Sequence, residues 1–161
     1  MAADILLKIE GVEGDSKTDG HEGEIDILSA SLGATNPSSR AYGGGAGTAK
    51  VNVHDLVITK RADKASPTFF LKTCEGTHYD SATLVFRKAG GDGGPVEYMK
   101  YEMTHVFVSS WQQSGGGNQF AMENVSLSFE KLKVTFTGQD DAGAATEPVE
   151  TEWDIAANKK P

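Results

Sequence analysis

The fold is decided by residues 125–136, which read Val125-Ser126-Leu127-Ser128-Phe129-Glu130-Lys131-Leu132-Lys133-Val134-Thr135-Phe136. The apolar residues occupy odd positions up to Phe129 and even positions from Leu132 onward. Because alternate residues of a strand point to opposite faces, the core-facing side is expected to change at Glu130-Lys131. A β-bulge, or a strand that leaves one sheet and joins another, would produce that change. The pattern therefore favours a barrel or an orthogonal sandwich over a flat open sheet.

Most of the remaining ordered chain also alternates with period two, which is typical of half-buried strands. The expected strands cover residues 5–9, 24–32, 50–60, 83–87, 96–111, 125–136 and 149–155. One segment breaks this pattern: Ser66 is a helix cap, Pro67 suits the first helical position and Gly76 suits the end. We expect a short helix there that covers an open end of the barrel and buries Cys74. The whole chain, residues 1–161, is then one mainly β domain, a barrel or an orthogonal sandwich with one short helix.

Charge and composition limit the function classes. The formal net charge of -8 argues against nucleic-acid binding, which depends on lysine and arginine, and it disfavours anionic membranes. No segment approaches the ~20 apolar residues of a membrane helix, so membrane insertion is not expected. The start Met1-Ala2-Ala3-Asp4 lacks the basic residues of a signal peptide. A route other than the general secretory pathway is therefore expected if the protein leaves the cell.

A glycine-rich stretch at about residues 33–48 separates two strand-like runs. Loops beyond about 12–15 residues are uncommon in compact domains unless they bind something. This stretch has little to pack, so either water or another subunit is expected to satisfy its backbone. We favour a contact with another subunit, and its candidate residues are Arg40, Tyr42, Gly43, Gly44, Gly45 and Gly47.

The sequence contains no motif that indicates catalysis. Gly47 and Lys50 lack the adjacency of a phosphate-binding loop, and Ile25 stands where a zinc-protease motif starting at His21 needs its second histidine. The four histidines lie in separate segments without metal-ligand spacing. We therefore expect no catalytic, cofactor or metal site, and no enzyme.

Several segments, taken in order, resemble the haemolysin-coregulated protein (Hcp) family, the tube proteins of bacterial type VI secretion systems. They are Ile5–Glu10 with Gly11, Val12, Gly14 and Ser16; Ile25–Leu28 with Ser31; Lys50–Leu56; the helix of Ser66, Pro67 and Cys74; and Val125, Leu127 and Phe129. The resemblance implies a small β-barrel of two sheets with one short helix. It also implies that subunits close into a homohexameric ring and that rings stack into a hollow tube. It also implies a contractile sheath that expels the tube, a spike (VgrG-like) protein on its tip and small effector proteins in its lumen. The protein would assemble in the bacterial cytoplasm and then be secreted to the extracellular space or a target cell.

A tube lumen needs short polar side chains that do not hold cargo too tightly. Ser29 and Ser31 share one face of the expected strand at 24–32, and they are the candidate lumen and effector contacts. Bulk solvent in place of a lumen would give the same alternation. The main rival function is a carbohydrate- or ligand-binding β-sandwich, followed by a hydrolase with carboxylates assembled in space.

Overall fold

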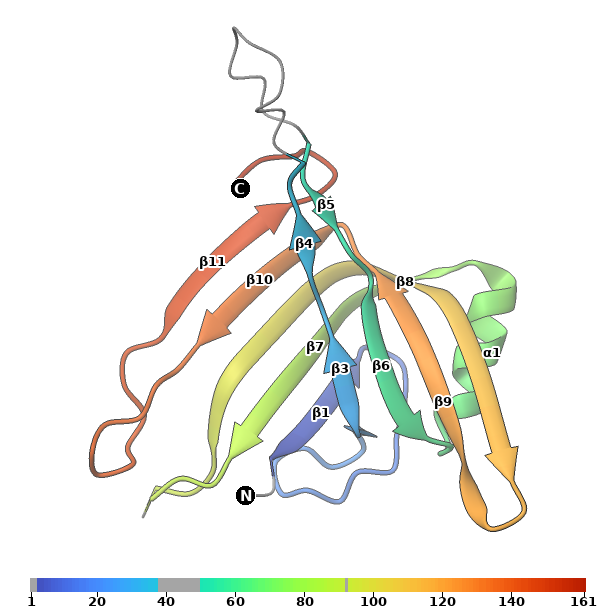
Figure 1. Ribbon diagram of the computed structural model, residues 1–161, viewed down its shortest axis with the longest axis horizontal. Coiled ribbons are helices and arrows are strands. Elements are labelled where there is room, and N and C mark those ends of the chain that lie inside the picture. The colour runs from blue at the N-terminus through green and yellow to red at the C-terminus, as the bar shows by residue number, and fades with distance from the viewer. Residues whose placement is uncertain (1–2, 38–49, 92) are drawn as a thin grey trace, which may run out of the picture.

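The structure, a computed structural model, describes residues 3–37, 50–91 and 93–161 and is mainly β. Within these residues one sheet has nine strands, a second sheet has two, and a single α-helix accompanies them (Figure 1). The elements are β1 (Asp4–Ile9), β2 (Ile25–Ile27), β3 (Ser29–Ser31), β4 (Ala34–Thr35), β5 (Asn52–Val53), β6 (Leu56–Arg61), α1 (Ser66–Glu75), β7 (His78–Lys88), β8 (Val96–Gly116), β9 (Gln119–Ser128), β10 (Lys131–Phe136) and β11 (Val149–Asp154).

The large sheet is antiparallel and runs in the order β2-β1-β7-β8-β9-β6-β3, with β10 and β11 branching from β8. Its two end strands are halves of one segment, residues 25–31. Ile27 pairs with Ile5 of β1, whereas Ser29 pairs with Thr59 of β6. The Leu28 N–H between them already bonds to the Thr59 carbonyl at 2.8 Å. The segment therefore leaves one end of the sheet and joins the other.

The structure corrects the prediction of a β-barrel, because the sheet of the described residues is not closed. Among the described residues the hydrogen-bonded path stops at β2 and β3, so the ladder does not close. The physical reason is that three-residue strands exchange partners at Leu28 instead of continuing one register around a barrel. The predicted mainly β class, two sheets and short helix are confirmed.

The change of phase predicted near Glu130 occurs between β9 and β10. The pairs Phe107–Ser128 and Thr104–Lys131 keep one register against β8, so no residue is inserted opposite that junction. Instead the outer neighbour changes, because β9 pairs with β6 and β10 pairs with β11. His105, across the junction in β8, has φ +52°, a left-handed conformation that turns the strand locally.

The helix α1 begins and ends close to the predicted positions. Its C-cap is Gly76 at φ +67°, whose N–H bonds to the Lys72 carbonyl. The predicted Ser66 cap is wrong, because Ala65 occupies the N-cap position and Ser66 is the first helical residue. Cys74, which we expected to be buried, is exposed.

One apolar core lies inside the large sheet and is closed on one side by α1. Its contributors come from both halves of the chain, and they include Leu7, Ile25, Ile58, Phe69, Leu84, Val106, Val125 and Leu127, each at most 1% exposed. Phe69 is the helical member, whereas Phe70 lies against Trp111 with 5.4 Å between ring centroids. Burial of this kind stabilises a fold by about 1.5–3 kcal/mol per large side chain.

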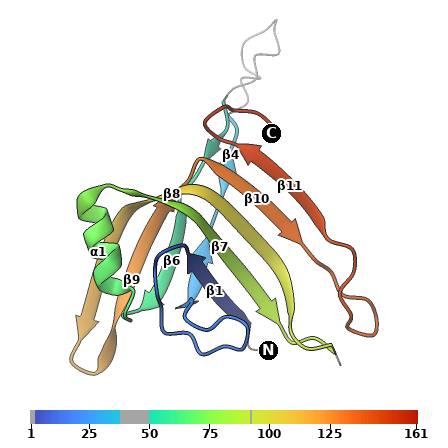
Figure 2. The ribbon, with the colours of Figure 1, turned by 180° about the vertical axis from the view of Figure 1, so that it is seen from behind.

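The molecule has two distinct ends. The β4–β5 ribbon projects at one end beside the C-terminus (Figures 1 and 2). The opposite end carries the loops 11–24 and 137–148 and the hairpin that joins β8 to β9. The strands run between these ends.

Candidate functional site

Ser29 and Ser31 are both exposed on β3, and Ala30 between them turns toward the core. This alternation follows from strand geometry, which sends neighbouring side chains to opposite faces. Ser29 pairs with Thr59 and Ser31 pairs with Val57, both on β6. The two serines therefore form the edge of a wider surface on the same face of the sheet.

That surface continues across β6, β9 and β8, and we call it the polar face. Each serine starts a row of cross-strand partners running from β3 to β8. The eight residues are Ser29, Thr59, Asn124 and Gln112 in one row and Ser31, Val57, Ser126 and Ser110 in the other. None is charged, although 24% of the chain is Asp, Glu, Lys or Arg. The Thr59 hydroxyl donates to the Asn124 side-chain oxygen at 2.9 Å, which joins neighbouring strands within the face.

Sequence reasoning found the two members on β3 and missed the other six. Their strands were expected, but the register between strands far apart in sequence was not. A shift of one residue would have put Lys60 or Val125 on this face instead. A signal was present in the small polar residues at alternate positions of 124–128, yet a solvent-facing strand gives the same signal.

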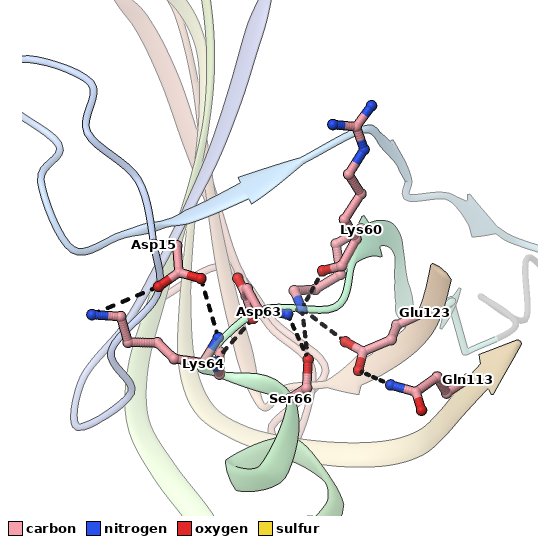
Figure 3. A network of polar contacts seen from close by, with 9 residues as sticks. Asp15, Lys60, Asp63, Lys64, Ser66, Gln113 and Glu123 are labelled. Atoms are coloured by element: carbon pink, nitrogen blue, oxygen red, sulfur yellow. Dashed lines mark hydrogen bonds and ion pairs between the residues drawn. The ribbon is translucent and has the colours of Figure 1, made fainter. Parts of the chain in front are cut away.

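A buried ion pair on the opposite side of these strands holds their register. Lys60 and Glu123 are cross-strand partners next to Thr59 and Asn124, and both side chains are fully buried. The Lys60 ammonium donates to Glu123 at 2.7 Å and to Asp63 at 2.8 Å (Figure 3). Gln113 of β8 donates to the second Glu123 oxygen at 3.0 Å.

The same cluster fixes the start of α1. The Ser66 hydroxyl accepts from the Asp63 N–H at 2.9 Å and from Lys60 at 3.4 Å (Figure 3). The Asp63 carboxylate also accepts from the Ala65 N–H. These bonds replace the side-chain cap that sequence analysis had assigned to Ser66. The helix and the strands of the polar face are thus joined through one lysine.

An apolar groove of about 680 Å³ lies at the end of the molecule that carries the β4–β5 ribbon. The ribbon forms one wall and β10, β11 and β8 form the other. Its main apolar lining residues are Leu32, Val51, Val53, Leu132, Trp153 and Ile155. Tyr101 also lines it, and burial, together with the neighbouring Tyr98, raises the pKa of Tyr101. The groove therefore presents no charge from this phenol at neutral pH.

Of the predicted loop at 33–48, the structure describes residues 33–37. Arg40, Tyr42, Gly43, Gly44, Gly45 and Gly47 lie outside the described residues. The predicted start of the loop at residue 33 is a correction, because Ala34 and Thr35 form strand β4, in which Ala34 pairs with Val53 and Thr35 with Asn52 of β5. The Gly33 carbonyl also accepts from the His54 N–H at 2.8 Å.

Within residues 3–37, 50–91 and 93–161, no three His, Cys, Asp or Glu side chains are grouped so that they could hold a metal ion. In the same part of the chain, no helix is long and apolar enough to cross a membrane.

Comparisons with known proteins define the class to which this fold belongs. Residues 6–136 match the family described as type VI secretion system effector, Hcp. Protein hcp1 of Pseudomonas aeruginosa is 41% identical over 160 residues, which cover 98% of each chain.

Solved structures agree with that match. One, described as the structure of a type six secretion system protein, has a TM-score of 0.90 and 29% identity over 99% of this chain and 100% of its own. The crystal structure of Hcp1 from Salmonella typhimurium has a TM-score of 0.81 and 34% identity over 100% of each chain. The chain belongs to the Hcp family of type VI secretion systems.

Proposed function

We propose that this chain is the structural subunit of the inner tube of a type VI secretion system. Six copies form a ring, and rings stack into a hollow tube that is expelled. Family membership supports the role, and the uncharged polar face supports its assignment to a tube wall. In this role the subunit acts by shape and assembly and performs no catalytic step.

The polar face is proposed to line the lumen. Seven of the eight polar-face residues present hydroxyls or amides, which hydrogen-bond weakly with a passing protein, and none of the eight carries a charge to hold it. Ser29 and Ser31 are the proposed effector contacts at the β3 edge of this wall. Ring symmetry would repeat each contact six times around the lumen, so weak contacts would retain cargo together.

A charge placed on this wall tests the assignment. Ser31→Glu should lower co-purification of small effector proteins by about tenfold or more. The carboxylate, repeated around the lumen, would repel acidic cargo or would lose its own hydration when cargo binds. Asn124→Asp, two strands away in the same face, should act in the same direction. Ser81→Glu, on an exposed position of β7, is the matched control. Unchanged cargo retention in both face variants, with rings intact, would remove the lumen assignment.

The ring itself is tested by native mass measurement. A sixfold assembly is expected from the purified protein. A monomer that binds a glycan array would favour the carbohydrate-binding alternative, although the comparisons above identify secretion-system proteins.

The glycine-rich stretch at 33–48 is proposed to contact an adjacent subunit or ring. The ordered β4–β5 ribbon at its base, which projects from the body, supports this role (Figure 1). Replacing residues 43–47 with a two-residue link should leave folded monomers and abolish stacked tubes. Tubes of normal length in electron micrographs would show that the stretch is not needed for assembly.

The remaining partners follow from the same role. We propose that a contractile sheath surrounds the tube, that a spike (VgrG-like) protein caps it, and that effectors travel inside it. Assembly in the bacterial cytoplasm would precede secretion to the extracellular space or a target cell. Co-purification of the chain with a sheath or spike component from assembled machines would test these contacts.

A further inference from the structure

The two ends of the molecule differ in charge. The loops 11–24 and 137–148, which we call the acidic end, contain eight acidic residues and one lysine. Several of these carboxylates are exposed and take part in no ion pair or hydrogen bond within the described chain. They are Asp19, Glu22, Asp141 and Glu147.

The opposite end has the opposite sign. Residues 33–37, 50–54 and 155–161, which we call the basic end, contain Lys50, Lys159 and Lys160 and no acidic residue. These lysines are exposed, and their ammonium groups have no carboxylate partner among the described residues. The carboxylates bordering this end, Asp55 and Asp154, accept hydrogen bonds from Ser109 and from the Ala157 N–H.

Each end also has an apolar feature, and the two features are complementary in shape. The β10–β11 pair carries Leu132 and Trp153 in the groove at the basic end. On the same face, at the acidic end of these two strands, Phe136 is 48% exposed and its cross-strand partner Val149 is 72% exposed. One end thus has an apolar groove, and the other has apolar side chains that project.

We propose that the basic end of one copy docks on the acidic end of a second copy, and that this contact holds one ring on the next. Lys50, Lys159 and Lys160 face the carboxylates of loops 11–24 and 137–148. The Phe136–Val149 pair of one copy enters the groove beside Trp153 of the other. Such a contact uses two different surfaces, so it repeats along an axis without closing.

The inference rests on the proposed tube function and adds the chemistry of the ring-to-ring contact. Exposed charges are screened beyond about 10 Å at 0.1 M salt and about 3 Å at 1 M. Stacking should therefore weaken as salt rises, whereas ring closure, which uses other surfaces, should respond less. Each pair is weak alone, and sixfold repetition makes the sum decisive.

Charge reversal at either end tests the contact. Lys159→Glu/Lys160→Glu makes both ends acidic. The fourfold variant Asp19→Lys/Glu22→Lys/Asp141→Lys/Glu147→Lys leaves four acidic residues against five lysines in loops 11–24 and 137–148, so it makes the acidic end net basic. Each should lower the fraction of stacked rings by about tenfold or more at low salt, as measured by sedimentation velocity and electron microscopy. The control is Lys72→Glu/Lys100→Glu, on α1 and β8, which changes the net charge by the same amount as Lys159→Glu/Lys160→Glu. This control should stack normally.

Mixing the two reversed variants gives the sharpest outcome. Each variant alone carries like charges at the facing ends, whereas the mixture restores opposite charges at every junction. Stacks that return only in the mixture, and that dissolve at about 0.5 M salt, support the proposal. Stacks unaffected by either reversal, or wild-type rings that never associate at low salt, overturn it while leaving the ring intact. Absence of the ring itself would overturn the proposed function instead.

Discussion

At the scale of single residues, the buried Lys60–Glu123 pair gives the clearest stability prediction. Lys60→Met leaves the Glu123 carboxylate buried without its cation, so we expect a loss of about 3–5 kcal/mol in the free energy of unfolding. Urea unfolding at one fixed protein concentration measures this change.

The double variant is the control for that experiment. Lys60→Met/Glu123→Leu removes both charges, and we expect it to recover most of the loss, because well-packed apolar pairs often replace buried ion pairs without cost. A single variant as stable as the wild type would show that the pair does not matter for stability.

Tyr79 gives a prediction in pH. Burial raises the pKa of Tyr79 from 10.0 to about 12, and the Glu75 carboxylate adds to the rise. An unfolded chain ionises this phenol at the lower value, so the contribution is fully present below pH 10 and is lost as the pH rises toward 12. Relative to Tyr79→Phe, the wild type should lose about 1–3 kcal/mol over that window. Parallel stability curves for the two proteins would contradict the assignment.

At the scale of elements, the β9–β10 junction depends on the backbone of His105. Its φ of +52° costs a side chain with a branched Cβ about 1–2 kcal/mol, whereas asparagine adopts this conformation readily. His105→Val should therefore destabilise the protein by about that amount, and His105→Asn should be nearly neutral. Thr104→Val, the neighbouring exposed position, is the control. Equal stability of the valine and asparagine variants would show that the junction does not need the left-handed turn.

The elements themselves were largely predictable, and their ends were less so. The odd-to-even change between Phe129 and Leu132 correctly located a discontinuity, because only one face of each strand is apolar. The prediction that Ser66 caps the helix was wrong because its hydroxyl accepts hydrogen bonds from the Asp63 N–H and from Lys60. The local sequence does not show that this lysine is buried. The predicted burial of Cys74 was wrong because Phe69 is the one apolar side chain that α1 buries fully in the core.

At the scale of the whole molecule, registers between distant strands could not be predicted. Ser31 is the cross-strand partner of Val57, whose partner on the other side is Ser126. No local pattern specifies that order of strands. The same limit hid the exchange of partners at Leu28, and with it the difference between a closed barrel and an interrupted ladder. The candidate serines were found because alternation within one strand is local, whereas the polar face that contains them is not.

The long strand β8 has a consequence for how the molecule comes apart. Its 21 residues bond to β7, β9 and β10 in turn, so it belongs to every large part of the sheet. Opening any one of those ladders leaves β8 held by the others, and its protected amides exchange with solvent only when the whole domain unfolds. In a hydrogen-exchange experiment, residues 99–108 should therefore be among the last to exchange, at the rate set by global unfolding. For a subunit in the proposed tube, this shared strand makes unfolding an all-or-none event instead of a gradual loss of strands.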